Sequence, residues 1–200
     1  MENKRIAILL SGRGSNFVAI CDAIHRRDLD AEICCVISNV ADATGLARAR
    51  EWGLTTLCIP SRGVERMEYD RRLVETLRPY EPALVCLAGF MRILSPVFIG
   101  AFPSRVLNIH PALLPSFPGL HAQRQALQYG VKISGCTVHL ADEGMDTGSI
   151  VMQRAVPVLD GDDEDSLSAR ILEQEHDVYW RAIEQVLARI STESIKNFKK

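Results

Sequence analysis

An asparagine, a histidine and an acidic loop form the part of the sequence best suited to chemistry. Asn108 and His110 lie two residues apart where a strand is expected to end, so their side chains point the same way. The loop from Asp142 to Gly148 holds three acids, and Asp146 stands just before its end and a returning apolar run. An uncharged amide donor beside a histidine whose charge is set by an aspartate suits the developing oxyanion of acyl-group transfer.

Pattern alone leaves a structural interpretation of these residues open. A single histidine at a strand end is more often structural than catalytic, and acidic loops with glycine are commonly simple solvated connections. Proline directly after His110 fixes the path of the chain and favours the catalytic interpretation. His121 and His139 are further candidates for the same site, but their spacing has no metal-ligand logic, so we expect no metal.

A glycine-containing loop, Ser11 to Asn16, joins the first expected strand to a helix. Gly14, Ser15 and Asn16 would let backbone N–H groups close on an anion at the positive end of that helix, which predicts a phosphate site. The loop lacks the Walker A ending, and Phe17 interrupts a full dinucleotide fingerprint. The second strand also ends without a ribose-binding acid, so a dinucleotide is disfavoured as the ligand. The alternative to a phosphate site is that the glycines serve only to form a tight turn.

Glu175 lies in the middle of an apolar stripe on the last expected helix. The stripe consists of Leu167, Ile171, Val178, Ala182 and Val186. An unpaired carboxylate at that position would be costly. Glu175 is therefore expected either to reach solvent at the edge of the core or to meet a polar ligand.

Arg92 follows the fourth expected strand, within the segment from Gly89 to Leu94. Its neighbours Phe90, Met91, Ile93 and Leu94 are expected to line an apolar slot for a flat ring. A buried loop that packs on the next helix explains the same pattern equally well.

Composition points to a globular protein and not to a disordered one. The chain has 200 residues, 47% hydrophobic and 24% charged, and we expect one domain over residues 1–200 without an internal boundary. A net charge of −2 argues against binding to nucleic acid or an anionic membrane. The six cysteines include no C-x-x-C pair and are expected to be buried thiols of a reducing compartment. No signal peptide or apolar span is visible, so we expect a soluble, cytoplasmic protein.

Apolar runs that alternate with amphipathic segments predict the fold. The expected strands are residues 6–10, 32–38, 54–59, 83–88, 105–110, 134–140 and 150–158. The first expected helix follows Asn16, and the second runs from an N-cap at Asp42 to residue 52. The third covers 65–77, and the fourth begins at Ser95-Pro96. The fifth ends near residue 129, and the sixth covers 163–190. This order predicts an α/β fold, a doubly wound and mostly parallel sheet flanked by helices, with a long C-terminal helix. Ligands of such sheets bind at the carboxyl ends of the strands, where both motifs above fall.

Taken together, these segments resemble the phosphoribosylglycinamide formyltransferases, a branch of the folate-dependent formyltransferase family. The resemblance covers nearly the whole chain, and its most specific part is the run Leu107-Asn108-Ile109-His110-Pro111-Ala112-Leu113-Leu114-Pro115-Ser116-Phe117-Pro118-Gly119-Leu120-His121. The wider group shares His-Pro-x-Leu-Leu-Pro, whereas the Phe-Pro-Gly-Leu-His continuation is typical of this branch. One departure is Ser149, which stands where the family usually has proline and puts the rigidity of the loop exit in question.

The resemblance implies a formyl transfer from 10-formyltetrahydrofolate, the co-substrate, to the amine of 5-phosphoribosylglycinamide. It implies that Asn108, His110 and Asp146 are catalytic. The residues implied for the ribonucleotide are Gly14, Ser15, Asn16, Gln174 and Glu175. Those implied for the folate are Arg66, Met91, Arg92, Ile93, Leu94, Asn108, Asp142, Glu143, Gly144, Met145 and Asp146. The expected partners are these small molecules alone, in a monomer or a homodimer.

Other functions fit parts of the pattern less well. A hydrolase that passes the formyl group to water would keep the catalytic trio but would not need a phosphate loop. A nucleotide-binding regulatory domain explains the glycine loop but leaves Asn108 and His110 without a role. An incomplete fingerprint disfavours a nicotinamide dehydrogenase, and a transformylase of aminoacyl-tRNA would need an RNA-binding domain for which the chain has little room.

Overall fold

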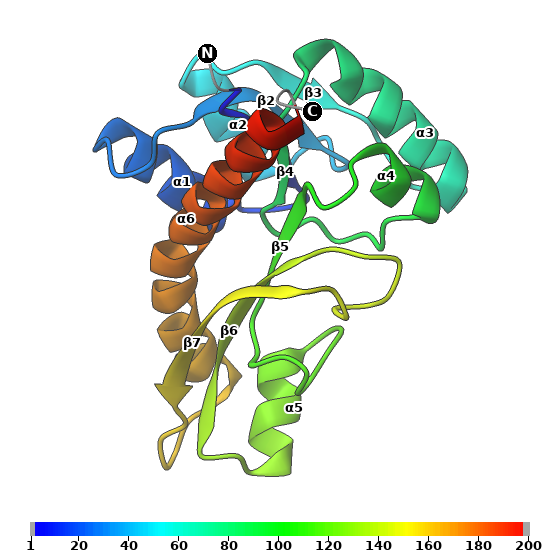
Figure 1. Cartoon of the computed structure of the whole chain (residues 1–200). Helices are drawn as coiled ribbons and strands as arrows, with labels where there is room; N and C mark the ends of the chain where they lie inside the picture. Colours follow the sequence, from blue (N-terminus) through cyan, green and yellow to red (C-terminus); the bar gives the residue numbers. More distant parts are fainter. Residues whose placement is uncertain (1–2, 198–200) are drawn as a thin grey trace.

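A seven-stranded mixed sheet forms the centre of the computed structural model, which describes residues 3–197 (Figure 1). The strand order is β3-β2-β1-β4-β5-β6-β7, parallel from β3 to β5 and antiparallel for the last two strands. The strands are β1 (Arg5–Leu10), β2 (Glu32–Ser38), β3 (Thr56–Cys58), β4 (Leu84–Leu87), β5 (Val106–His110), β6 (Ile133–Leu140) and β7 (Ile150–Pro157). The doubly wound, mostly parallel sheet predicted from the sequence is confirmed.

Helices cover both faces of the sheet because the inner strands are apolar on both sides. They are α1 (Ser15–His25), α2 (Thr44–Glu51), α3 (Arg66–Leu77), α4 (Pro96–Ala101), α5 (Ala122–Tyr129) and α6 (Glu164–Asn197), with a 3-10 turn, η1 (Arg78–Tyr80). The core on one face includes residues of α1, α2, α5 and α6, and the core on the other includes residues of α3 and α4. In Figure 1 the long α6 runs beside α1, on the opposite side of the sheet from α3 and α4.

Some expected boundaries were wrong, and the structure gives physical reasons. The second helix begins at Thr44 after an N-cap at Ala43, not at Asp42, because the Gly45 amide donates to the Gly12 carbonyl at 3.0 Å in place of a capping side chain. The third strand is three residues long because it pairs only with the last three residues of β2, from Val36 to Ser38. The last helix extends past the expected end at residue 190.

The pairing of β5 with β6 sets up the centre of the candidate site. In this antiparallel register Asn108 lies opposite His139, and His110 lies opposite Thr137. Side chains on alternate residues share a face, so these four residues meet on one side of the sheet.

The structure also bears on the state of the cysteines and on membrane-spanning helices. All six cysteines are free thiols, and four of them are buried, as the sequence predicted for small hydrophobic residues. Within residues 3–197, no helix combines the length and the apolar character that crossing a membrane requires.

Candidate active site

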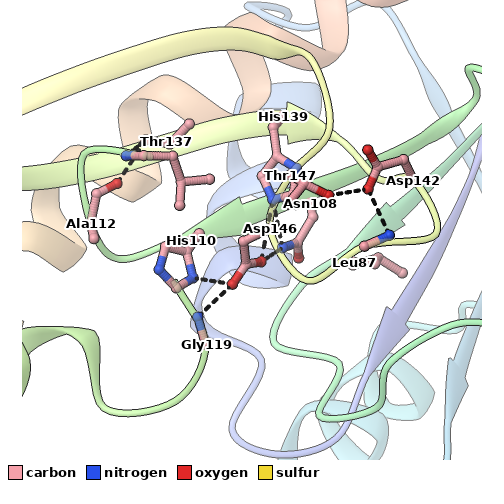
Figure 2. A network of polar contacts seen from close by, with 12 residues as sticks. Leu87, Asn108, His110, Ala112, Gly119, Thr137, His139, Asp142, Asp146 and Thr147 are labelled. Carbon is pink, nitrogen blue, oxygen red and sulfur yellow. Dashed lines mark hydrogen bonds and ion pairs between the residues drawn. The ribbon is translucent and has the colours of Figure 1, made fainter. Parts of the chain in front are cut away.

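Asn108, His110 and Asp146 come together at the carboxyl end of β5, and Figure 2 shows the Asp146 carboxylate between the other two side chains. Its Oδ2 lies 3.3 Å from Nδ1 of His110, and its Oδ1 lies 3.5 Å from Nδ2 of Asn108. The side chains of His110 and Asp146 are 6% and 13% exposed, so solvent screens the contact between them little. The three residues that the sequence placed in one site therefore lie together, with Asp146 in contact with each of the other two.

The loop after β6 turns Asp146 toward the sheet. Asp146 has a φ of 57°, in the left-handed region that aspartate tolerates better than most residues. Its Oδ2 accepts a hydrogen bond of 2.8 Å from the Gly119 amide, which ties this loop to the proline-rich segment after β5. Asp142 closes the other end of the loop by accepting from the Gly144 amide at 3.0 Å and the Thr147 hydroxyl at 2.8 Å.

The contacts around Asp146 keep it ionised. Burial raises the pKa of its carboxyl, but the nearby His139 ring, the hydrogen bond from the Gly119 amide and the nearby His110 ring outweigh that effect and lower the pKa below its ordinary value. Nε2 of His110 lies 2.8 Å from the Phe117 carbonyl oxygen, while Nδ1 faces the Asp146 carboxylate. Both partners are acceptors, so this geometry satisfies both ring nitrogens only when each carries a hydrogen.

Of the two further candidate histidines, one lies in the cluster around Asp146 and the other does not. His139 is 2% exposed and its Nε2 lies 3.0 Å from Nδ2 of Asn108, inside the cluster. His121 caps α5, is largely exposed and lies 3.9 Å from Glu164, outside the cluster. Within the described part of the chain, no group of three or more histidine, cysteine or acidic side chains is placed to hold a metal ion.

Sequence reasoning missed a buried polar cluster that holds the segment after β5. The Thr137 hydroxyl donates to the Ala112 carbonyl at 2.7 Å and accepts from the Leu114 amide at 3.0 Å. Gln153 of β7 donates to the same hydroxyl at 2.9 Å and to the Leu114 carbonyl at 3.0 Å. The only available signal was that Thr137 is two residues from His139 on an expected strand, since the partners lie on other elements.

The glycine loop is built around a close approach of two backbones. Gly14 is the N-cap of α1 with a φ of 70°, and a Cβ there would lie 3.0 Å from the Cα of Gly45. Only glycine combines that conformation with that approach at low cost. Ser15 and Asn16 follow in the first turn of α1, so the amides of this turn stand at the carboxyl end of β1 as predicted.

Glu175 meets this loop instead of reaching solvent, which corrects one of the two expectations for it. It is 7% exposed, and Nδ2 of Asn16 donates to its Oε2 at 2.8 Å. Burial raises the pKa of Glu175 to about 7, although the hydrogen bond from Asn16 lowers it. Oδ1 of Asn16 is buried without a hydrogen-bond partner among the described residues, and Gln174 beside Glu175 is half-buried.

The burial of Glu175 makes the stability of the fold depend on pH. Because its pKa rises from 4.5 to about 7, the folded chain binds more protons than the unfolded chain between these values. The free energy of unfolding should therefore fall as the pH rises from about 4.5 through 7, by at most about 3 kcal/mol from this group. Glu175→Gln should remove this fall, as measured by urea unfolding at pH 5 and pH 8. Glu173→Gln, an exposed neighbour, is the control, and equal pH profiles for all three proteins would contradict the assignment.

The segment after β4 differs from the apolar slot expected there. Phe90 and Leu94 are 8% and 4% exposed and pack into the core, whereas Met91 and Ile93 are 70% and 47% exposed. The four side chains therefore do not line one slot, because alternate residues face opposite ways. The Arg92 guanidinium lies 4.4 Å from the centre of the Tyr69 ring, so it is engaged within the protein.

Hydrogen bonds tie this segment to the loops after β1 and β2. The Met91 amide donates to the Ser11 hydroxyl at 2.8 Å, and that hydroxyl donates to Oδ1 of Asn39. The remaining residues that the sequence assigned to the folate lie at the surface. Arg66 begins α3 and is exposed, and Asp142, Glu143, Gly144 and Met145 form the exposed part of the acidic loop.

Comparisons with known proteins agree on one family. The formyl transferase family matches residues 4–183. Phosphoribosylglycinamide formyltransferase of Escherichia coli K12 is 47% identical over 175 residues, which are 87% of this chain and 82% of that protein. The crystal structure of glycinamide ribonucleotide transformylase 1 from Symbiobacterium toebii is 47% identical, with a TM-score of 0.90 over 93% of this chain and 88% of that one.

Some relatives are much longer than this chain. The trifunctional purine biosynthetic protein adenosine-3 of Drosophila melanogaster is 48% identical over 185 residues. The match covers 91% of this chain and 14% of that protein, so the chain spans about one seventh of its length.

Proposed function

The chain belongs to the formyl transferase family, in its phosphoribosylglycinamide formyltransferase branch, and on that premise we propose that it transfers a formyl group to the amine of 5-phosphoribosylglycinamide. The donor is 10-formyltetrahydrofolate, and the products are formylglycinamide ribonucleotide and tetrahydrofolate, a step of de novo purine synthesis. The observation that carries the proposal is the convergence of Asn108, His110 and Asp146 at the carboxyl end of β5.

Asn108 and His110 act as hydrogen-bond donors to the reacting formyl oxygen. When the amine attacks the formyl carbon, that oxygen becomes an oxyanion, and donors already aimed at it stabilise the transition state more than the ground state. An N–H of Asn108 and the imidazolium of His110 supply such donors. To reach substrate, Nε2 of His110 exchanges its hydrogen bond with the Phe117 carbonyl for one with the reacting group.

Asp146 acts through His110. Its carboxylate accepts from Nδ1 of the imidazole and so fixes the orientation of the ring. The proton that the attacking amine loses is transferred to the leaving nitrogen of the folate, through His110 or a water molecule. Charge stays balanced because the amine gives up the proton that the leaving nitrogen receives.

The glycine loop and α6 bind the ribonucleotide. Gly14, Ser15 and Asn16 present the amides of the first turn of α1 to the phosphate, and Gln174 and Glu175 contact the rest of the acceptor. The unpaired Oδ1 of Asn16 supports this assignment, because a buried acceptor without a partner is costly unless a ligand satisfies it.

The folate lies against the loops after β4 and β6. Met91 and Ile93 offer exposed apolar side chains, while Arg92 contributes its backbone because its guanidinium packs on Tyr69. Leu94 supports the segment from the core. Arg66 meets the acidic end of the donor, and Asp142 to Asp146 close on the reacting end together with Asn108.

The fate of a labelled formyl group tests the reaction. Donor carrying a ¹³C-formyl group is incubated with enzyme and ribonucleotide, and mass spectrometry follows the label. We expect one labelled formyl group on each ribonucleotide formed. Labelled formate as the main product would instead make the protein a hydrolase.

Gly14→Val should weaken binding of the ribonucleotide selectively. A side chain at a φ of 70° is strained and would press on Gly45, so the KM for the ribonucleotide should rise about tenfold while the folate KM changes little. Gly53→Val is the matched control, because Gly53 has a φ of 72° but has open space around it at the end of α2. An equal loss of affinity for both substrates would contradict the phosphate assignment.

We further propose that the chain acts as one domain, since one continuous sheet carries both the glycine loop after β1 and the catalytic residues at the end of β5. Its partners are then the two small molecules. No step of the reaction calls for a metal, and both a monomer and a homodimer are compatible with it.

A further inference from the structure

His139 stands directly across the sheet from Asn108. The antiparallel register of β5 and β6 pairs the two residues, and Figure 2 shows the ring above the Asn108 amide. The ring is 2% exposed, so its surroundings are fixed by protein groups and not by solvent. A buried imidazole needs a partner for each nitrogen, which makes its contacts informative.

The contacts of His139 define how it bonds to Asn108. Nε2 lies 3.0 Å from Nδ2 of Asn108, and Nδ1 lies 3.3 Å from the Leu140 carbonyl oxygen. A carbonyl only accepts, so the ring hydrogen belongs on Nδ1, which leaves the lone pair of Nε2 to accept an N–H of Asn108. Nε2 is also 3.6 Å from Oδ1 of Asp146, which is longer than a hydrogen bond.

This hydrogen bond determines where the remaining donor of Asn108 points. Nδ2 carries two hydrogens, and with one held by His139 the other is directed toward Asp146, whose Oδ1 lies 3.5 Å away. That contact is at the limit for a hydrogen bond. A stronger acceptor beside His110, such as a developing oxyanion, can therefore replace Asp146 as the partner of this N–H. A rotated amide would present its oxygen there and repel an oxyanion.

We propose that His139 is a positioning residue: by accepting one N–H of Asn108, it directs the other N–H at the reacting formyl oxygen. The inference rests on the proposed function, but its structural half can be tested without activity. In this role His139 needs no contact with either substrate, because it acts through Asn108.

The tautomer of His139 provides the test that does not depend on catalysis. Long-range ¹⁵N–¹H correlation spectra of the native enzyme at pH 7.5 distinguish a ring hydrogen on Nδ1 from one on Nε2. We expect the Nδ1–H form, with the lone pair of Nε2 accepting the Asn108 amide. An Nε2–H form would overturn the proposal, whatever reaction the protein catalyses.

Kinetics of two variants test the consequence for the reaction. His139→Gln can place a carbonyl oxygen near the position of Nε2, whereas His139→Met fills the space without a comparable acceptor. We expect the Gln variant to keep kcat within about threefold of the native value and the Met variant to lose about 10- to 100-fold, with both KM values little changed. Equal kcat values for the two variants would contradict the positioning role.

A double-mutant cycle separates positioning from a merely structural effect. If His139 acts only through Asn108, changing His139 to Met in an Asn108→Ala background should lower kcat no further. An additive loss of kcat would contradict the proposal. So would a result in which His139→Gln and His139→Met lose the same stability and the same kcat. If the native enzyme transfers no formyl group at all, the proposed function fails while the tautomer measurement still decides the hydrogen bond.

Discussion

Asp146→Asn should lower kcat for formyl transfer by about 10²–10³-fold while leaving the fold intact. The substitution keeps the shape of the side chain but removes the charge that lies 3.3 Å from His110. His110 then loses the carboxylate that accepts from Nδ1 and orients the ring, so its donor to the oxyanion is less well aimed. Asparagine is the better choice than alanine here, because Asp146 has a φ of 57°, which asparagine adopts more readily.

Further measurements test the role of Asp146. Thermal unfolding and both KM values should stay close to native, and Asp160→Asn, whose side chain is 99% exposed, is the control. His110→Ala should lose at least as much activity as Asp146→Asn. Because Asp146 acts through His110, the double variant should lose no more than His110→Ala alone. Near-normal turnover by Asp146→Asn would remove Asp146 from the catalytic trio.

Asn108→Ala should produce a loss of similar size for a different reason. It removes an uncharged donor to the oxyanion, which costs about 3–4 kcal/mol of transition-state stabilisation, or about 10²–10³ in rate. Since the ground-state formyl oxygen carries little charge, the KM of the donor should change much less than kcat.

Single-turnover experiments with saturating enzyme measure this effect on the chemical step. The remaining activity should keep the pH dependence of the native enzyme, because the Asn108 side chain does not ionise. An unchanged single-turnover rate, or a loss confined to the KM of the donor, would contradict the role of Asn108 in stabilising the oxyanion.

The sheet could be predicted because its signals are local. The strand from Glu32 to Ser38 has the expected ends, and its residues from Ile33 to Ile37 are apolar on both faces. The start of α2 could not be predicted in the same way. Asp42 has the right side chain for a cap, but the amide of Gly45 finds its acceptor in Gly12, which lies far away in the sequence.

In the candidate site too, local spacing could be predicted and contacts between distant residues could not. Asn108 and His110 share a face because they are two residues apart, and local spacing predicts this. The pairing of Asn16 with Glu175 joins residues 159 positions apart, and the contact of His139 with Asn108 depends on the register of two strands. Neither follows from a local pattern, so sequence could nominate Glu175 and His139 without predicting what they contact.

The dependence of folate release on the acceptor tests the central claim most directly. Native enzyme is mixed with 10-formyltetrahydrofolate, and the deformylated folate is followed optically with and without 5-phosphoribosylglycinamide. We predict release only when the ribonucleotide is present, with one formylated ribonucleotide formed for each folate released. Equal release in its absence would show that water is the acceptor, and no release in either case would contradict formyl transfer altogether.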